Sequence, residues 1–225
     1  MGVENVILGL AGLPTLIGKL RASHESAPRI FSMLELRPLT IPERKMAVQI
    51  GMDIANGKNQ QKTRMELEAA EMLADLSEGY PHFIQQFGYC AFEADKDYTI
   101  DRDDVVRGAY SENGAISQLG AKYFEEAYVS KINSDDYRLL LNVMADHGDS
   151  WVSRKQLIAE SSLKDTTVNN ALAALKRKDI ILADESRQGH YRLPTRSFAA
   201  WINAIKSAPP GTDPDNLELP FAPRA

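Results

Sequence analysis

The chain has 225 residues, of which 44% are hydrophobic and 25% are charged, a composition typical of a globular protein with one large or two small domains. Its single cysteine excludes a disulfide framework within the chain and suits a reducing compartment. The formal net charge is −5, yet residues 136–206 carry 11 basic and 8 acidic side chains, and a basic segment of this kind can mark a nucleic-acid surface.

The chain opens with the apolar run Val6–Leu8, which predicts a strand, and continues with GLAGLPTLIGKL, the stretch Gly9–Leu20. A phosphate-binding loop has four residues between its two glycines and a hydroxyl side chain directly after its lysine. Here Gly12 and Gly18 enclose five residues, and a leucine follows Lys19. The stretch is therefore not a phosphate-binding loop.

The same region predicts neither a membrane span nor a secretory signal. The uncharged run from Val6 to Gly18 has thirteen residues, whereas a helix that crosses a bilayer needs about 20. A secretory signal begins with a basic segment, and the only early charge is Glu4. We expect a soluble, cytoplasmic protein.

The next region predicts a short helix at Thr15–Ser23 and an extended piece from Arg29, then a helical bundle. Its first helix begins at the motif T-I-P-E, because Thr40 and Glu43 can form a capping box, and the polar stretch Ala55–Lys62 should follow it as a loop. A second helix should end near Gly79, a third should open at Pro81, and a fourth should run from Asp101 or Asp103 toward Lys131, with a break near Gly114. The apolar faces are predicted at Met46, Ala47, Ile50 and Ile54, at Leu67, Ala70, Leu73 and Leu76, and at Phe83, Ile84, Phe87 and Ala91.

The acidic segment Asp95–Asp104 raises the question of a calcium site. A calcium loop of the helix–loop–helix type needs glycine at its sixth position and glutamate at its twelfth. Those places hold Ile100 and Val106. We interpret the segment as a solvated loop with a helix cap, and we predict no metal site.

From residue 135 the order of elements predicts a winged helix-turn-helix, which has three helices followed by a β-hairpin. The hairpin is expected around the turn Glu185–Gly189, and a final helix follows it. The residues predicted to face the core are Leu139, Leu140, Val143, Met144, Leu157, Ile158, Val168, Leu172, Leu175, Phe198, Trp201 and Ile205.

No arrangement of residues in the sequence indicates a catalytic site. There is no nucleophile elbow, and His82, His147 and His190 fall in different predicted elements, so we interpret each as an ordinary structural or surface histidine. Cys90 lies on the apolar side of a predicted helix and is expected to be a buried, inert thiol.

The winged helix carries the candidate nucleic-acid contacts. In such modules the second helix of the motif enters the major groove and meets base edges or phosphates, where asparagine suits adenine and lysine or threonine suits phosphate. The alternative is a module that docks onto protein. The candidate DNA-binding residues are Arg154, Lys155, Lys164, Thr166, Thr167, Asn169, Asn170, Arg187 and Arg192, with His190 beside them on the wing.

Three motifs and their order resemble the C-terminal part of AAA-plus ATPases of the archaeal-type and origin-recognition-like group, which is related to signal-transducing NTPases. They are VILGLAGLPTL at 6–16, APRIFSMLELRPLT at 27–40 and SEGYPHFIQQFG at 77–88, followed by the winged-helix order. The resemblance covers roughly residues 3–205. It implies a mainly α fold, in which a helical lid-type bundle precedes a winged helix-turn-helix with a small β-hairpin.

The resemblance also assigns domains and sites. Residues 1–39 would be a remnant of the ATPase core, 40–132 the lid, 133–207 the winged helix and 208–225 a flexible proline-rich tail. Arg29 would be an arginine finger that reaches a neighbouring subunit's nucleotide, as a catalytic residue. Pro81 and His82 occupy the nucleotide-binding position called sensor 2, where many relatives carry arginine, and Ala11 and Gly12 replace the usual polar residue of sensor 1.

By this resemblance the chain is a fragment of an ATP-binding switch protein. The missing ATPase core would bind ATP and magnesium, whereas this chain holds no cofactor. The implied partners are DNA, the missing core and further copies in a homo-oligomer, but not a membrane. The alternative is a region of a signalling ATPase whose winged helix mediates protein–protein contacts.

Adding ATP with constant magnesium should leave the melting temperature of this chain unchanged. A ligand raises the melting temperature only by binding to the folded state, and the sequence supplies no loop that would hold the phosphates. Differential scanning fluorimetry measures the effect. An upward shift that grows with ATP concentration would contradict our interpretation of Gly9–Leu20.

Overall fold

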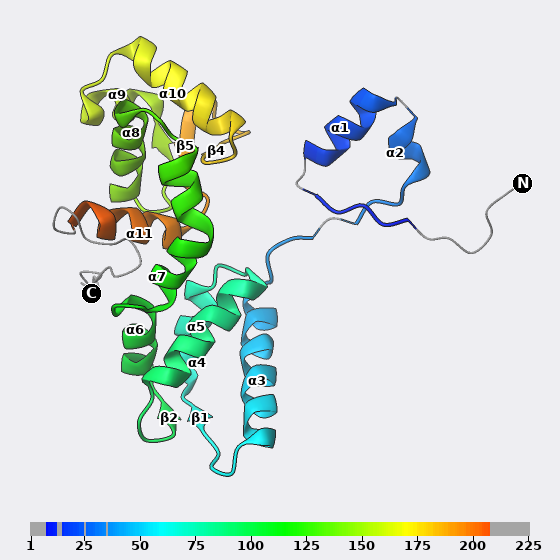
Figure 1. The fold of residues 1–225 in the computed structure, drawn as a ribbon, viewed down its shortest axis with the longest axis vertical. Helices are drawn as coiled ribbons and strands as arrows, with labels where there is room; N and C mark the ends of the chain where they lie inside the picture. Colours follow the sequence, from blue (N-terminus) through cyan, green and yellow to red (C-terminus); the bar gives the residue numbers. More distant parts are fainter. Residues whose placement is uncertain (1–7, 13–14, 25, 35, 208–225) are drawn as a thin grey trace, which may run out of the picture. The chain divides into compact units, whose positions relative to one another are not determined.

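The computed structural model describes residues 8–12, 15–24, 26–34 and 36–207, and it is mainly helical, as predicted (Figure 1). The chain divides into two compact units, the first ending at Arg37 and the second beginning at Pro38. Except for Leu8, the predicted strand Val6–Leu8 and the predicted tail at 208–225 lie outside the described residues.

The first unit contains α1 (Thr15–Ser23), as predicted, and the short helix α2 (Ala27–Ile30). The prediction of an extended piece that begins at Arg29 was wrong at its start, because Arg29 belongs to α2. The chain after α2 has no regular secondary structure among its described residues, and Leu34 and Leu36 there are exposed.

The first part of the second unit is the predicted bundle. In sequence order its elements are α3 (Ile41–Lys58), β1 (Arg64–Met65), α4 (Leu67–Leu76), α5 (Pro81–Ala94), β2 (Thr99–Ile100), α6 (Arg102–Tyr110), α7 (Ala115–Leu119) and the π-helical turns η1 (Gly120–Phe124) and η2 (Glu126–Ser130). The two short strands pair in parallel. The predicted capping box is present, since the Thr40 amide donates to Glu43 Oε2 at 2.7 Å, and the predicted apolar face of α5 is buried.

The prediction of burial was wrong for four apolar positions of the bundle, three on α3 and one on α4. On α3 the side chains of Met46, Ile50 and Ile54 are exposed, and Val48 is buried instead. Leu67 is also exposed, at the start of α4. The physical reason is that α4 and α5 pack on the Val48 side of α3. A periodic pattern identifies an apolar face, but it does not say which other element covers it.

The polar loop predicted at Ala55–Lys62 was also partly wrong, because α3 continues to Lys58. Asn56 stabilises this longer helix through two hydrogen bonds to the backbone of Thr63. Its side-chain amide donates to the Thr63 carbonyl at 2.7 Å and accepts from the Thr63 amide at 2.8 Å. The polar residues therefore extend the helix and fasten the turn that follows it.

The second part of the unit is the predicted winged helix. It contains α8 (Asp135–Asp146), β3 (Val152–Ser153), α9 (Arg154–Ser161), α10 (Asp165–Arg177), β4 (Leu182–Ala183), β5 (His190–Arg192) and α11 (Arg196–Ser207). The three strands form an antiparallel sheet in the order β3-β5-β4, so the predicted hairpin is confirmed and β3 adds a third strand. Val168, Leu172 and Leu175 are buried as predicted, whereas Leu139 is 40% exposed and Leu141 is buried.

The helix α11 joins the winged helix to the bundle, because it packs against both α8 and α7. Trp201 is fully buried within an aromatic cluster that contains Phe124, Tyr128 and Phe198, with ring centroids 5.8–6.3 Å from the indole. A β-carbon on Gly120 would overlap the indole nitrogen of Trp201. The π-helical turn η1 therefore approaches α11 closely only because residue 120 has no side chain.

A polar contact fixes the same junction. The Glu78 carboxylate, in the turn between α4 and α5, accepts hydrogen bonds from the backbone amides of Arg196 (3.0 Å) and Ser197 (3.2 Å) at the start of α11. The Arg196 guanidinium donates to Asp75 Oδ2 at 2.9 Å. Burial raises the pKa of the Glu78 carboxyl, although the two backbone hydrogen bonds act to lower it. The bundle thus caps the first turn of α11.

Replacing Gly120 with alanine should lower the free energy of unfolding by about 1–3 kcal/mol, the usual cost of overpacking a core. Gly88→Ala is the matched control, because Gly88 is also helical and a β-carbon there meets no atom within 4 Å. The control should leave stability unchanged or raise it by up to about 1 kcal/mol. Urea unfolding of both variants measures the difference, and equal midpoints would contradict the close approach.

Candidate nucleic-acid interface

The exposed side of α10 is formed by the predicted contact residues. Val168 and Leu172 face the core from this helix, which packs against α8 and α9. The opposite side is open to solvent, as the position of α10 at the end of the winged helix suggests (Figure 1). The predicted residues on this side are Lys164, Thr166, Asn169 and Asn170, which are exposed, and Thr167, which is half-buried.

Arg154 is already paired within the domain. Its Nη2 donates to Asp165 Oδ2 at 2.8 Å, and its Nε donates to Asn169 Oδ1 at 2.6 Å. The carboxylate therefore offsets the charge of Arg154, and the Asn169 carbonyl oxygen is already in use. Because an asparagine that recognises adenine uses both its oxygen and its nitrogen, Asn170 is better placed than Asn169 to contact a base.

Arg187 is likewise held by a neighbour in the wing. Its Nε donates to Asp184 Oδ2 at 2.8 Å, and the Ser186 hydroxyl donates to Asp184 Oδ1 at 2.6 Å. These hydrogen bonds, that of Ser186 foremost, hold the pKa of the Asp184 carboxyl well below its usual range. Arg187 therefore shapes the turn of the wing, and half of its side chain stays exposed.

On β5 the predicted wing residue Arg192 lies against Trp151. The Arg192 guanidinium carbon is 4.9 Å from the centroid of the Trp151 ring, a cation–π distance. Arg192 Nε and His190 Nδ1 are buried and have no hydrogen-bond partner among the described residues. Because His190 and Arg192 are two positions apart on β5, their side chains lie on the same face of the small sheet.

Four cations around α10 form no ion pair within the described part of the chain: Lys155, Lys164, Lys176 and Arg177. All four side chains are exposed. Lys155 lies in the first turn of α9, Lys164 directly precedes α10, and the other two lie in the last turn of α10. The sequence-based prediction missed Lys176 and Arg177, although the basic run K-R-K was the available signal.

The residues assigned from the resemblance to nucleotide contact fall on other elements than α10. Arg29 is exposed on α2 of the first unit. Pro81 is the first residue of α5, and His82 lies edge-on to the Tyr123 ring with the centroids 5.1 Å apart. His82 Nε2 is buried without a described hydrogen-bond partner.

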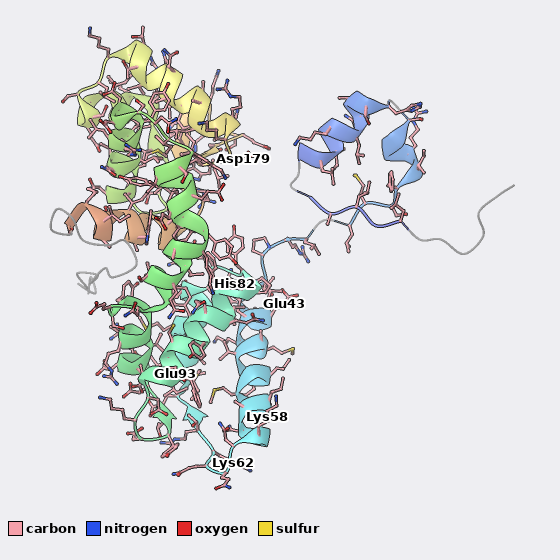
Figure 2. All side chains as sticks on the ribbon, in the orientation of Figure 1. Glu43, Lys58, Lys62, His82, Glu93 and Asp179 are labelled. Carbon is pink, nitrogen blue, oxygen red and sulfur yellow. The ribbon has the colours of Figure 1, made fainter. Side chains whose placement is uncertain are left out.

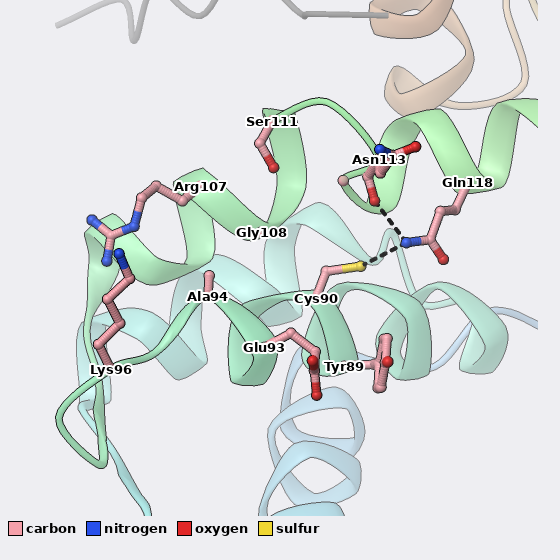
Figure 3. Close-up of a pocket in the computed structure, with 11 residues that line it drawn as sticks. Tyr89, Cys90, Glu93, Ala94, Lys96, Arg107, Gly108, Ser111, Asn113 and Gln118 are labelled. Carbon is pink, nitrogen blue, oxygen red and sulfur yellow. Dashed lines mark hydrogen bonds between the residues drawn. The ribbon is translucent and has the colours of Figure 1, made fainter. Parts of the chain in front are cut away.

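A groove of about 460 Å³ lies between α5 and α6 (Figure 3). The Cys90 thiol accepts hydrogen bonds from the side-chain amides of Gln86 (3.5 Å) and Gln118 (3.6 Å). Burial raises the pKa of Cys90, so the thiol is buried and protonated, as expected of an inert core cysteine. Among the described residues, no group of three histidine, cysteine or acidic side chains is arranged to hold a metal ion.

No helix in the described part of the chain is long and apolar enough to cross a membrane. No protein-family model matches the chain, and neither does any curated protein.

Solved structures of RuvB from Thermotoga maritima are similar to the chain at low identity. A lysine-to-arginine mutant is 16% identical with a TM-score of 0.34, and a threonine-to-valine mutant is 15% identical with a TM-score of 0.33; each match covers 78% of this chain and 52% of that one. The RuvB Holliday junction branch migration motor is 14% identical with a TM-score of 0.34, over 87% of this chain and 65% of that one. The chain thus spans about half the length of the first two structures.

Because the pKa of the Asp184 carboxyl is lowered, we expect the hydrogen bonds that shape the turn of the wing to persist at mildly acidic pH. The hydrogen bonds to this carboxylate are fully present above the ordinary aspartate pKa of about 3.9, and they break only as the pH falls through the lower pKa of the folded state. The amide NMR signals of Ser186 and Arg187 should stay in place from neutral pH down to about pH 4. In Asp184→Asn these signals should be displaced at every pH, and a transition of the parent near or above the ordinary aspartate pKa would contradict the prediction.

Proposed function

We propose that residues 38–207 are the lid and winged-helix part of an AAA-plus switch protein, and that the winged helix binds double-stranded DNA through α10. The observation that carries this proposal is the open side of α10, where cations that have no ion pair in the described structure flank a row of amide and hydroxyl side chains. By the resemblance in sequence motifs, a core outside this chain would bind ATP and magnesium, and this chain alone would not hydrolyse ATP.

The dimensions of α10 suit a DNA duplex. Thirteen residues give a helix about 20 Å long, and the major groove of B-DNA is about 12 Å wide and accepts an α-helix. Lys164 at the N-terminal end of α10, with Lys155 in the first turn of α9, and Lys176 and Arg177 at the other end of α10 would then meet phosphates on both sides of the groove. Thr166 and Asn170 lie on the exposed side between them.

The ion pairs change the roles of two predicted contact residues. Arg154 and Arg187 each have a carboxylate partner inside the domain, so a phosphate would have to compete with that partner. We therefore infer that these two arginines position the helix and the wing. The lysines without a described partner would supply most of the attraction to DNA, because releasing counterions from phosphates depends on uncompensated cations.

A second candidate function is a signalling scaffold whose winged helix mediates protein–protein contacts. The observation that favours it is the firm docking of α11 on the bundle by Trp201 and by the Glu78 carboxylate. Such a junction transmits a rotation of the lid to the winged helix in either function. The two candidates therefore differ in what the open side of α10 touches.

Reversing the charge of Lys155 and Lys164 together (K155E and K164E) should weaken binding to duplex DNA strongly and reduce its dependence on salt. Removing one phosphate contact from a complex with B-DNA lowers the slope of log K against log salt by about 0.9. The matched control is Lys62→Glu with Lys96→Glu, because both lysines are exposed in the bundle and unpaired in the described structure. Fluorescence anisotropy across a salt series measures both variants.

The control should bind DNA with nearly the slope of the parent, since its lysines lie far from α10 in sequence and in fold. Circular dichroism of each variant checks that it is folded, as expected for exposed substitutions. If the α10 variant binds as tightly as the parent at equal salt, the DNA proposal fails. A parent with no salt-dependent binding at all would favour the scaffold function.

A further inference from the structure

The outer face of α3 is an apolar stripe that no element of the described second unit covers. Met46 is 65% exposed, Ile50 51% and Ile54 56%, although all three are large and aliphatic. At about 100° per residue, Ile50 lies at the centre of the face opposite the buried Val48, with Met46 and Ile54 about 40° to either side of it. The three side chains therefore form a continuous ridge along the helix.

Glu43 and Lys58, at the two ends of α3, are exposed and carry opposite charges. Arg44 and Lys45, beside Glu43, are half-buried and bound within the bundle, Arg44 to the Leu39 and Ala74 carbonyls and Lys45 to Glu71. Glu43 lies in the first turn and Lys58 at the last residue of the helix, as Figure 2 shows at its two ends. Both side chains are exposed, and Lys58 forms no ion pair in the described structure. Beside the ridge, a β-carbon on Gly51 would meet no atom within 4 Å, so another helix can approach closely there.

We propose that this face docks on the same face of a second copy of the chain, with the two α3 helices antiparallel. A two-fold axis through Ile50 places the Ile50 side chains of the two copies against each other. It also places Met46 of one copy against Ile54 of the other. The same three residues of each copy thus cover the ridge of the other, as in any two-fold interface, where both copies use the same surface.

Charge selects the antiparallel arrangement over the parallel one. In the antiparallel pair, Glu43 of each copy comes within about one turn of Lys58 of the other, so two opposite-charge contacts form at the ends. A parallel pair would place Glu43 near Glu43 and Lys58 near Lys58. The helix dipoles favour the same choice, because each positive N-terminus lies beside a negative C-terminus.

The association should be weak and dependent on concentration, because one helix face buries less surface than the roughly 1,200 Å² of a stable interface. Sedimentation velocity of the full chain should show a monomer–dimer equilibrium. Ile50→Glu should abolish the dimer, since it places two carboxylates together on the axis. Leu182→Glu is the matched control, because Leu182 is 39% exposed on β4 of the winged helix, and it should dimerise like the parent.

Cysteine cross-linking tests the direction of the helices, in a Cys90→Ala background that removes the native thiol. Ile50→Cys should form a disulfide dimer by itself. Met46→Cys and Ile54→Cys should each stay monomeric alone and cross-link when the two proteins are mixed. If Met46→Cys and Ile54→Cys each cross-link alone, the antiparallel arrangement is overturned, and a parent that stays monomeric at every concentration overturns the interface itself.

Discussion

The contact between Trp201 and Gly120 fixes how the two halves of the second unit are joined. The indole occupies the space of a missing side chain, so η1 can lie directly against α11. The rings of Phe124, Tyr128 and Phe198 close around it and exclude water. Because α11 belongs to the winged helix and also packs on α8, this one contact fixes the position of the winged helix on the bundle. Because α11 packs on α7 and α8, this contact leaves the outer side of α10 exposed.

The turn between α4 and α5 adds hydrogen bonds to this apolar contact. The Glu78 carboxylate accepts hydrogen bonds from the first backbone amides of α11. The neighbouring Gly79 carbonyl accepts a hydrogen bond of 2.8 Å from the Leu39 amide. A β-carbon on Gly79 would overlap the Leu39 backbone, and its positive φ of 86° favours glycine. The chain that enters the bundle and the helix that carries the winged helix are therefore held by adjacent residues.

The charges of the winged helix fall into two groups with different roles. Arg154, Arg187 and Arg196 each form an ion pair that shapes a helix start, a wing or the junction. The lysines at the ends of α10 have no such partner in the described structure. An exposed cation without a partner keeps its attraction for a phosphate, whereas a paired one must first give up its carboxylate. The proposed contact with DNA therefore depends on a few lysines rather than on the net charge of the domain.

The sequence by itself determined the elements whose signals are local. The capping box at Thr40, the buried stripe of Val168, Leu172 and Leu175, and the hairpin of the wing follow from residues only a few positions apart, and the structure confirms them. The face of α3 that is covered, the partner of Arg154 and the cap of α11 by Glu78 were decided only by the tertiary structure. Arg196 and Glu78 are 118 positions apart, and such pairs form only when packing brings distant elements together. Periodicity identifies an apolar face, and the residue type identifies a charged side chain. Neither identifies the element that packs on that face or the partner that binds that charge.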